Sequence, residues 1–457
     1  RMSDDGTKIL VPLSGRLFVL APADGSVREL VSRAGAPLDA RFSPDAGKVS
    51  AVRDGDLWVI DVRSGKERKL TRSDGTVRYG ESEFVAQEEM SRHRGYWWAP
   101  DGTRLIVQST DNSALETMHI ADATRPERAP RTWPYPRPGK ANATVRLGLV
   151  DFSDGKWTPI RWDRERYEYV AKVDWPARGR PTVLLQNREQ TEQTLFAIST
   201  EDGTTTALLT ETDDAWVEID ENMPRWLDDG SGFFWTTERN GGRELEIRDA
   251  DGSLRQRVTP PEMGYRGFVR HDPATRRVWV EAGSDPTQVH LFRVPLGEGR
   301  PERISREPGE HSMTPAPPGP ILVRRRTTDQ GSTVTLWNED RPLDASLRSA
   351  AEAEPPPPSV EFTKTGGEPD LHAVLVRPRD FDAGRRYPVI VHVYGGPTST
   401  MVRRDPRRYW LAQWIADHGY VVVSIDGRGT PHRGRDWHRA VKYDLISLPL
   451  ADQVRGL

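Results

Sequence analysis

The sequence predicts a mixed fold in which an all-β region, interpreted as a β-propeller, occupies residues 1–350 and an α/β region occupies residues 360–457. Two observations support this division. Turn-and-strand units recur about every 40 residues in the first region, and a strand–helix–strand pattern follows a proline-rich segment at 351–359. The chain of 457 residues exceeds a usual domain of about 100 to 200 residues, so two domains are expected.

Each repeat of the first region combines a turn rich in Asp and Gly with an apolar strand. Turns of this kind lie at residues 3–6, 43–47, 99–102 and 227–230. Apolar strands that precede a glycine turn lie at residues 17–20, 57–60, 195–198 and 289–292. A period of about 40 residues matches one four-stranded propeller blade, and its return in phase favours a propeller over a β-sandwich. Because no strands precede the first unit, we expect the propeller to be incomplete at its start.

Composition excludes several classes of protein. With 65 Lys and Arg against 68 Asp and Glu, the chain has no electrostatic footprint for nucleic acid or an anionic membrane. It contains no cysteine, which excludes disulfides, thiolate metal sites and a cysteine nucleophile. The acidic turns at 213–214 and 228–230 lack the spacing of a calcium loop. We therefore expect no metal site and no cofactor, and no membrane segment, because the chain has no run of about 18 apolar residues.

The proline run that ends at Pro358 is too rich in proline for a helix or a central strand, so residues 351–359 are interpreted as a linker. Beyond it, residues 371–376, 387–393 and 420–426 have strand patterns. Residues 409–418 carry apolar side chains at helical spacing, and Gly419 is a plausible helix C-cap. The order strand, helix, strand predicts a βαβ unit.

Two short motifs carry residues suited to chemistry. Gln87-Glu88-Glu89 places two carboxylates side by side, a pattern that is also common on a solvated helix face. Tyr394-Gly395-Gly396-Pro397 ends a predicted strand. Its glycines allow a ligand to approach the backbone, and its tyrosine hydroxyl can donate a hydrogen bond to a developing oxyanion.

Residues 392–397, 421–426 and 427–430 together resemble the opening of the catalytic domain in the prolyl oligopeptidase clan of serine peptidases. The glutamate motif, the segment 95–102 that follows it and the segment 135–145 are similar to the dipeptidyl peptidase IV branch, particularly its bacterial members. The resemblance implies a β-propeller followed by an α/β-hydrolase domain, which would begin at residue 360. It also implies a homodimer and, for bacterial members, a periplasmic location.

The resemblance assigns roles to three residues. Glu88 and Glu89 match the pair that binds the free α-ammonium group of a peptide, and Tyr394 matches the tyrosine that stabilises the tetrahedral oxyanion. An ammonium ion placed between two carboxylates relieves their mutual repulsion and donates charge-assisted hydrogen bonds to them. Because this site fixes the N-terminus, the implied activity is release of Xaa-Pro or Xaa-Ala dipeptides through an acyl-enzyme.

The nucleophile of an α/β-hydrolase lies in a Gly-x-Ser-x-Gly elbow, and the chain contains no such motif. Residues 449–457 resemble the helix that precedes the elbow, so the catalytic serine, aspartate and histidine are expected beyond residue 457. The chain alone is expected to be inactive. Packing or solvent exposure is the interpretation for the remaining candidates: His392, His418, His432, His438 and Ser424.

Two alternatives remain open from sequence. The first is a non-catalytic propeller protein that binds peptides or partners, since relatives without the nucleophile exist. The second is another peptidase of the same clan, such as an endopeptidase or an acylaminoacyl peptidase. Glu88 and Glu89 argue against the second, because an ammonium-binding pair has no use for blocked or internal sites.

Overall fold

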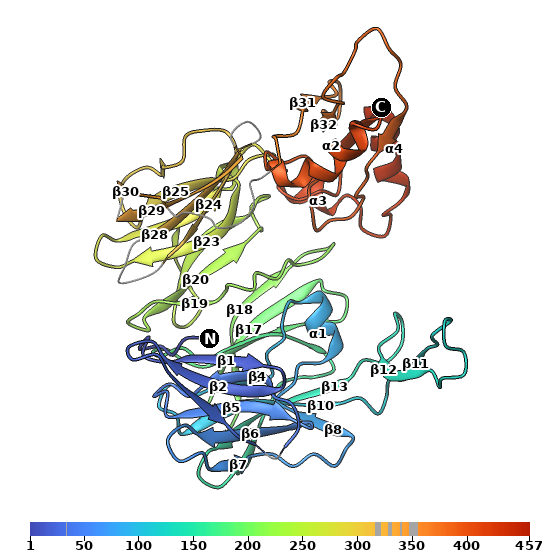
Figure 1. The fold of residues 1–457 in the computed structure, drawn as a ribbon. Coiled ribbons are helices and arrows are strands. Elements are labelled where there is room, and N and C mark those ends of the chain that lie inside the picture. Colours follow the sequence, from blue (N-terminus) through green and yellow to red (C-terminus); the bar gives the residue numbers. More distant parts are fainter. Residues whose placement is uncertain (33, 316–320, 328–330, 339–340, 347–354) are drawn as a thin grey trace. The chain divides into compact units, whose positions relative to one another are not determined.

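The computed structural model describes residues 1–32, 34–315, 321–327, 331–338, 341–346 and 355–457. The chain divides into two compact units. The first comprises residues 1–234 and 248–253, and the second comprises residues 235–247 and 254–457 (Figure 1).

The first unit contains successive antiparallel sheets of three to five strands. Its first sheet has three strands: β1 (Ile9–Leu13), β2 (Arg16–Ala21) and β3 (Ser26–Leu30). The second contains β4 (Leu38–Phe42), β5 (Lys48–Arg53), β6 (Asp56–Asp61) and β7 (Glu67–Lys69). The third contains β8 (Val77–Tyr79), β9 (Tyr96–Trp98), β10 (Arg104–Asp111), β13 (Thr144–Asp151) and β14 (Trp157–Ile160). The fourth contains β15 (Tyr169–Asp174), β16 (Thr182–Gln186), β17 (Glu192–Ile198) and β18 (Thr205–Thr212).

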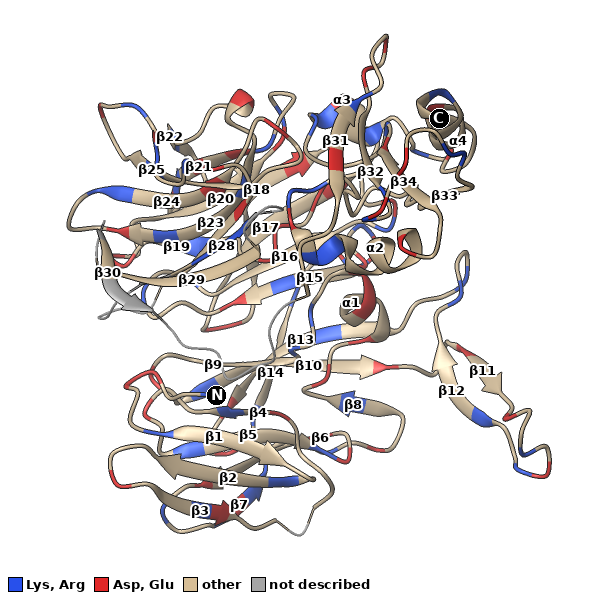
Figure 2. Ribbon diagram, turned by 45° about the horizontal axis from the view of Figure 1, so that its top comes forward, with Lys and Arg blue, Asp and Glu red and all other residues tan. Residues whose placement is uncertain are grey.

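The residues of the next sheet are divided between the two units: β19 (Arg225–Trp226), β20 (Gly232–Thr237), β21 (Glu244–Asp249) and β22 (Leu254–Arg257). A separate hairpin, β11 (Glu116–Ile120) and β12 (Arg131–Tyr135), is inserted between β10 and β13. It extends away from the sheets of the first unit (Figure 1 and Figure 2).

The recurring turns have a common hydrogen-bond pattern. At 43–47, the Ser43 hydroxyl donates to Asp45 Oδ1 (2.5 Å), and the same oxygen accepts the Gly47 amide at 3.0 Å. The first turn repeats the arrangement with Ser3 and Asp5, at 2.6 Å between Ser3 Oγ and Asp5 Oδ1. Each aspartate therefore satisfies donors within its own turn, which explains why the same residue types precede successive strands.

Neighbouring sheets of the first unit pack through the adjacent residues Trp97 and Trp98 on β9. Successive strand residues point to opposite faces. Trp97 lies in a core cluster with Val170 of β15 and Val183 of β16, whereas Trp98 lies in a cluster with Leu57 of β6. The tryptophan pair is therefore packing between three sheets, with each side chain at most 6 % exposed.

The second unit contains two further four-stranded antiparallel sheets and one mixed sheet. The first comprises β23 (Tyr265–Asp272), β24 (Arg277–Ala282), β25 (His290–Pro295) and β26 (Glu302–Arg303), preceded by the 3₁₀ helix η1 (Pro261–Met263). The second comprises β27 (Glu310–Thr314), β28 (Ile321–Thr327), β29 (Gly331–Asn338) and β30 (Arg341–Ser346).

The mixed sheet has the order β31-β32-β34-β33, with β31 (Val360–Lys364), β32 (His372–Val376), β33 (Val389–Val391) and β34 (Val421–Asp426). Its helices are η2 (Pro406–Tyr409), α2 (Trp410–Ala416), α3 (Arg435–Arg439) and α4 (Ser447–Gly456). β33 and β34 pair in parallel on either side of α2 in the chain, which confirms the predicted βαβ unit. Gly419 has φ +92°, consistent with its predicted place after the helix.

Residues 355–359 of the predicted linker have no regular secondary structure, and residues 351–354 lie outside the described residues. Within the second unit, ion pairs join the α/β region to the sheets before it. Arg403 pairs with Glu310 of β27, and Arg326 of β28 lies 2.9 Å from Asp405. Ion pairs as well as the covalent chain therefore connect the α/β region to β27 and β28.

Two buried histidines stack in the second unit. His290 of β25 and His311 of β27 have ring centroids 5.3 Å apart, and His290 is 5 % exposed. The His290 ring accepts a hydrogen bond from Arg303 Nη2, whose distance to Nε2 is 2.9 Å. Burial, followed by the charges of Arg303 and His311, lowers the pKa of His290 to about 4.

We expect His290 to make the protein less stable in acid. A folded-state pKa below the unfolded value of about 6.5 means that the unfolded chain binds the proton more readily, so stability is complete above pH 6.5 and falls towards pH 4. The full loss is about 3 kcal/mol. Urea unfolding midpoints of wild type and His290→Gln, measured from pH 7.5 to 4, should diverge, with the wild type falling more steeply. His119→Gln, at an exposed position, is the control, and parallel curves for wild type and His290→Gln would contradict the prediction.

Candidate active site

The two glutamates predicted as a binding pair lie on a short helix, α1 (Phe84–Glu89), between β8 and β9. Ala86 is the buried residue of this helix, whereas Glu88 and Glu89 are both exposed. Within the described part of the chain, neither glutamate has a side-chain hydrogen bond or an ion pair. Figure 2 shows the acidic residues of α1 in red. Both carboxylates are therefore available to a cation from outside the unit.

A buried ion pair holds the two ends of α1. Glu83, immediately before the helix, accepts two hydrogen bonds from Arg92 Nη2, at 3.1 and 2.9 Å. The backbone amide of Arg92 donates to Ala86 O inside the helix at 2.9 Å. Because the Glu83 and Arg92 side chains are 5 % and 6 % exposed, this pair is shielded from solvent and fixes where the helix begins and ends.

Every donor of the Arg92 guanidinium is satisfied. In addition to Glu83, it donates to Arg94 O, to Gln108 Oε1 of β10 and to Val170 O of β15, at 2.7–2.9 Å. Gln108 also donates to Glu83 Oε2 at 2.6 Å. We call Glu83, Arg92 and Gln108 the α1 anchor. It joins the helix to β10 of its own sheet and to β15 of the next sheet.

Two further contacts orient the helix. The Gln87 side chain donates to Ser82 O at 2.6 Å, so the first residue of the Gln-Glu-Glu motif has a structural contact. The Phe84 ring meets the Tyr135 ring of β12 edge-on, with centroids 5.1 Å apart. The projecting hairpin therefore packs against the beginning of α1.

Tyr394 follows β33 and is half-buried, and its hydroxyl hydrogen-bonds the Thr398 hydroxyl. The second glycine of the motif has a steric explanation here. A Cβ at Gly396 would lie 2.8 Å from the Tyr394 hydroxyl oxygen and 3.0 Å from its ring carbon Cζ. Glycine at position 396 therefore gives the phenol room to lie over the turn.

The loop after Tyr394 is fixed at its far end by the last residue of β34. Asp426 accepts hydrogen bonds from the amides of Met401 (2.7 Å) and Val402 (3.0 Å). Burial raises the pKa of Asp426, and the two amide hydrogen bonds oppose the rise. The Tyr409 hydroxyl donates to Arg403 O and accepts the Arg403 amide, both at 2.8 Å. Contacts from β34 and η2 thus order the segment that follows the turn.

Residues 449–457, interpreted as the helix before a nucleophile elbow, lie largely in α4. Asp452 of α4 is 1 % exposed and accepts hydrogen bonds from the Arg428 amide (2.7 Å) and from Arg428 Nη2 (2.6 Å). Gln453 donates to Ile425 O at 2.9 Å. The helix is therefore held against the C-terminal end of β34, the sheet edge where α/β folds bind ligands.

The histidines named from sequence have structural surroundings. His392 is exposed, and His418 Nδ1 lies 2.7 Å from Trp414 O. His432 has φ +75° and an exposed side chain. His438 contacts Pro397 O. The geometry agrees with solvent exposure of His392, His418 and His432 and with packing of His438, and not with a general base.

One serine–histidine contact was missed from sequence: His290 Nδ1 lies 3.1 Å from Ser305 Oγ. A catalytic base needs a carboxylate that stabilises its imidazolium form. Here Arg303 contacts the ring in place of a carboxylate, and its charge opposes protonation of His290. Ser305 Oγ already accepts the Leu291 amide at 3.0 Å. This pair is therefore structural. Ser424, also considered from sequence, is buried on β34 at 5 % exposure.

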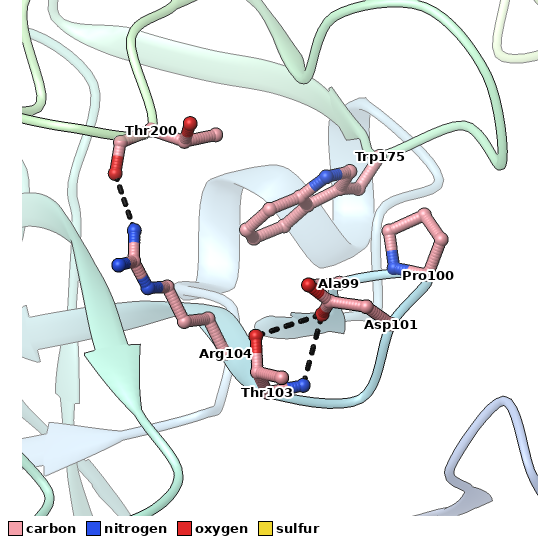
Figure 3. Close-up of a pocket in the computed structure, with 7 residues that line it drawn as sticks. All are labelled: Ala99, Pro100, Asp101, Thr103, Arg104, Trp175 and Thr200. Atoms are coloured by element: carbon pink, nitrogen blue, oxygen red, sulfur yellow. Dashed lines mark hydrogen bonds between the residues drawn. The ribbon is translucent and has the colours of Figure 1, made fainter.

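A pocket of about 400 Å³ lies in the first unit, at the turn between β9 and β10 (Figure 3). Its polar groups bind one another: Asp101 Oδ1 accepts from the Thr103 amide and hydroxyl, and Arg104 donates to Thr200 O. α1 precedes β9 and this turn follows it, so the pocket lies at the opposite end of β9 from the glutamates. It is a separate feature from the candidate site.

The α1 anchor was also missed from sequence. The available signal was Gln108, a polar residue that directly follows the apolar run 105–107 on β10. Within the described residues, no helix is long and apolar enough to cross a membrane.

Comparison with known proteins identifies the family of the chain. Residues 3–327 match the family model of the dipeptidyl peptidase IV N-terminal region. The chain belongs to the dipeptidyl peptidase IV family. Residues 406–457 also match the model of the prolyl oligopeptidase family, as expected for a member of that clan.

Relatives in the dipeptidyl peptidase IV family include mouse dipeptidyl peptidase 8, 24 % identical over 92 % of this chain and 58 % of the relative. A probable dipeptidyl-aminopeptidase B of Emericella nidulans is 26 % identical over 91 % of this chain and 50 % of the relative. The chain thus spans about half the length of these curated relatives.

Among solved structures, Porphyromonas gingivalis dipeptidyl peptidase 4 aligns with a TM-score of 0.88 at 22 % identity, covering 100 % of this chain and 68 % of the other. A putative dipeptidyl aminopeptidase IV from Bacteroides ovatus aligns with a TM-score of 0.83 at 21 % identity, covering 98 % and 67 %. The predicted fold class is confirmed: an N-terminal β-propeller followed by the first part of an α/β-hydrolase domain.

Proposed function

We propose that the protein is a serine exopeptidase of the dipeptidyl peptidase IV type, which releases N-terminal Xaa-Pro or Xaa-Ala dipeptides through an acyl-enzyme. The observation that supports this most strongly is the family match over residues 3–327, which includes α1 with two exposed glutamates that bind no group of the described chain. Peptides with a free N-terminus are the proposed substrates, and a homodimer is the proposed assembly.

In this proposal Glu88 and Glu89 bind the substrate ammonium, and that contact sets the position of the scissile bond. Tyr394 then donates a hydrogen bond to the oxyanion of the tetrahedral intermediate. The Tyr394 hydroxyl also contacts the Thr398 hydroxyl, and because a phenol can both donate and accept, it can accept from Thr398 while it donates to the oxyanion. The three residues supply binding and charge stabilisation but no nucleophile.

We further propose the domain limits expected from sequence, with a propeller domain at 1–350, a linker at 351–359 and part of the hydrolase domain at 360–457. Residues 1–457 contain no Gly-x-Ser-x-Gly elbow. The 457 residues alone should therefore be inactive, and the serine, aspartate and histidine of the triad should be supplied by sequence outside them.

The proposed function is tested by the release of a chromogenic group from Gly-Pro and from N-blocked Gly-Pro. The 457-residue chain and the protein extended through its complete reading frame are assayed side by side. We expect activity from the extended protein on the free substrate alone. Activity from the 457 residues would refute the account of the nucleophile, and peptide binding without hydrolysis by the extended protein would favour a non-catalytic binding protein.

Tyr394→Phe should raise the activation free energy in the extended protein by about 2.7–4 kcal/mol, because one oxyanion donor is lost. This change lowers kcat roughly 100-fold to 1,000-fold. KM should change little, since the hydroxyl acts in the transition state. The matched control is Tyr387→Phe, whose hydroxyl accepts the Asp382 amide at 3.0 Å and should not affect kcat. Equal kcat values for wild type and Tyr394→Phe would exclude the assigned role.

A further inference from the structure

The short helix α3 contacts the turn that carries Tyr394. His438 and Arg439 of this helix are buried, at 6 % and 7 % exposure. His438 Nε2 lies 2.7 Å from Pro397 O, and Arg439 Nη1 lies 2.9 Å from His438 Nδ1. The two contacts occupy both ring nitrogens of the histidine.

These partners determine the protonation of His438. A backbone carbonyl can only accept, so Nε2 must carry the hydrogen that binds Pro397 O. A guanidinium can only donate, so Nδ1 must offer its lone pair to Arg439. His438 is therefore held as the neutral Nε2–H tautomer, which is a donor of fixed direction.

The loop between β20 and β21 fixes Arg439 in turn. Arg439 Nη2 donates to Glu238 Oε2 at 2.5 Å, immediately after β20. At the other end of α3, the Arg435 amide donates to Gly241 O at 2.9 Å. Both ends of the helix thus contact residues 238–241, and all of these residues belong to the second unit.

The contact with Pro397 bears on Tyr394 through one peptide group. The carbonyl of Pro397 belongs to the same peptide plane as the amide of Thr398, so a hydrogen bond to this oxygen sets the orientation of Thr398. The Thr398 hydroxyl is the partner of the Tyr394 hydroxyl. The series of contacts therefore runs from Glu238 through Arg439, His438 and the turn to the phenol.

We propose that His438 is a positioning residue for Tyr394, and that the propeller loop carrying Glu238 acts on acyl transfer through it. The inference rests on the proposed role of Tyr394 in the dipeptidyl peptidase reaction. His438 does not touch substrate; it places the oxyanion donor by fixing the Pro397–Thr398 peptide.

Two substitutions of His438 separate its hydrogen bond from its bulk. The amide nitrogen of His438→Gln can occupy the position of Nε2 and donate to Pro397 O, whereas that of His438→Asn corresponds to Nδ1 and falls short. In the extended protein acting on a Gly-Pro chromogenic substrate, His438→Asn should lower kcat roughly 10-fold to 100-fold, because a misplaced group costs up to about 100-fold. KM should stay within about twofold, and His438→Gln should recover most of kcat.

The Tyr394→Phe background decides whether His438 acts through the phenol. There, His438→Asn should lower kcat by less than about twofold, since coupled residues are non-additive. An equal loss in both backgrounds, or equal losses for Asn and Gln, would overturn the proposal. Glu238→Gln is a second probe that leaves the α3 core intact, and its kcat loss should likewise disappear in Tyr394→Phe. Failure of the proposed function looks different: wild type would release no dipeptide, or Tyr394→Phe would keep full kcat.

Discussion

Replacing Glu88 or Glu89 with alanine is expected to lower kcat/KM for a free Gly-Pro substrate. The expected loss of transition-state stabilisation is about 2–5 kcal/mol, the cost of leaving a desolvated ammonium without one partner. This is a loss of roughly 30-fold or more. Both side chains are exposed and neither forms a hydrogen bond or an ion pair with a described group, so the unfolding midpoint should not change. Steady-state kinetics and urea unfolding of the extended protein provide the two measurements.

The controls distinguish a specific site from general surface charge. Glu127→Ala removes an exposed glutamate from the segment between β11 and β12 and should leave kcat/KM unaltered. On an N-blocked substrate, which wild type is not expected to cleave, neither α1 variant should gain activity, since no ammonium is present to bind. If Glu88→Ala and Glu89→Ala both keep wild-type kcat/KM on the free substrate, the assignment of the pair is wrong.

Replacing Arg92 with methionine is expected to destabilise the first unit by about 3–5 kcal/mol, because Glu83 is then left buried and charged without its counter-ion. The same change removes the side-chain bonds between Arg92 and Glu83 at the two ends of α1, so KM for a free N-terminus should rise as well. A fall in the urea midpoint, together with an increase in KM, would be observed.

The double variant Glu83→Gln/Arg92→Met should be less destabilised than Arg92→Met, since it removes both charges of the buried pair. Arg188→Ala is the matched control. Arg188 pairs with Glu168 at 3.1 Å, but both side chains are about one-third exposed, so its loss should cost at most about 1 kcal/mol. Equal effects of Arg92→Met and Arg188→Ala would show that the α1 anchor does not stabilise the unit as described.

The repeated sheets could be predicted because their turn chemistry is local. Ser43, Asp45 and Gly47 satisfy one another within five residues, so the same residue types recur wherever the turn recurs. Element boundaries in the α/β region depend on distant contacts instead. Tyr409, predicted to begin a helix, lies in η2, where its hydroxyl binds the backbone of Arg403. The strand predicted over 387–393 is limited to Val389–Val391.

The candidate site could be predicted in part for the same reason. Glu88, Glu89 and Tyr394 belong to contiguous motifs, so their residue types and order are visible in the chain. The residues that hold them are not contiguous. Arg92 contacts Val170, which lies 78 positions away, and Glu238 contacts Arg439 across 201 positions. Such partners become apparent only when the folded sheets bring them together.

The α1 anchor spans a joint, because Arg92 binds Gln108 of one sheet and Val170 of the next. The position of the α1 carboxylates therefore depends on how the two sheets are aligned, and not on either sheet alone. Under the proposed function, a shift between the two sheets would change where a peptide amine binds, even when no glutamate is altered. Under the proposed function, substrate affinity would then depend on the packing of the first unit, and a substitution that loosens the Trp97 cluster is expected to lower that affinity.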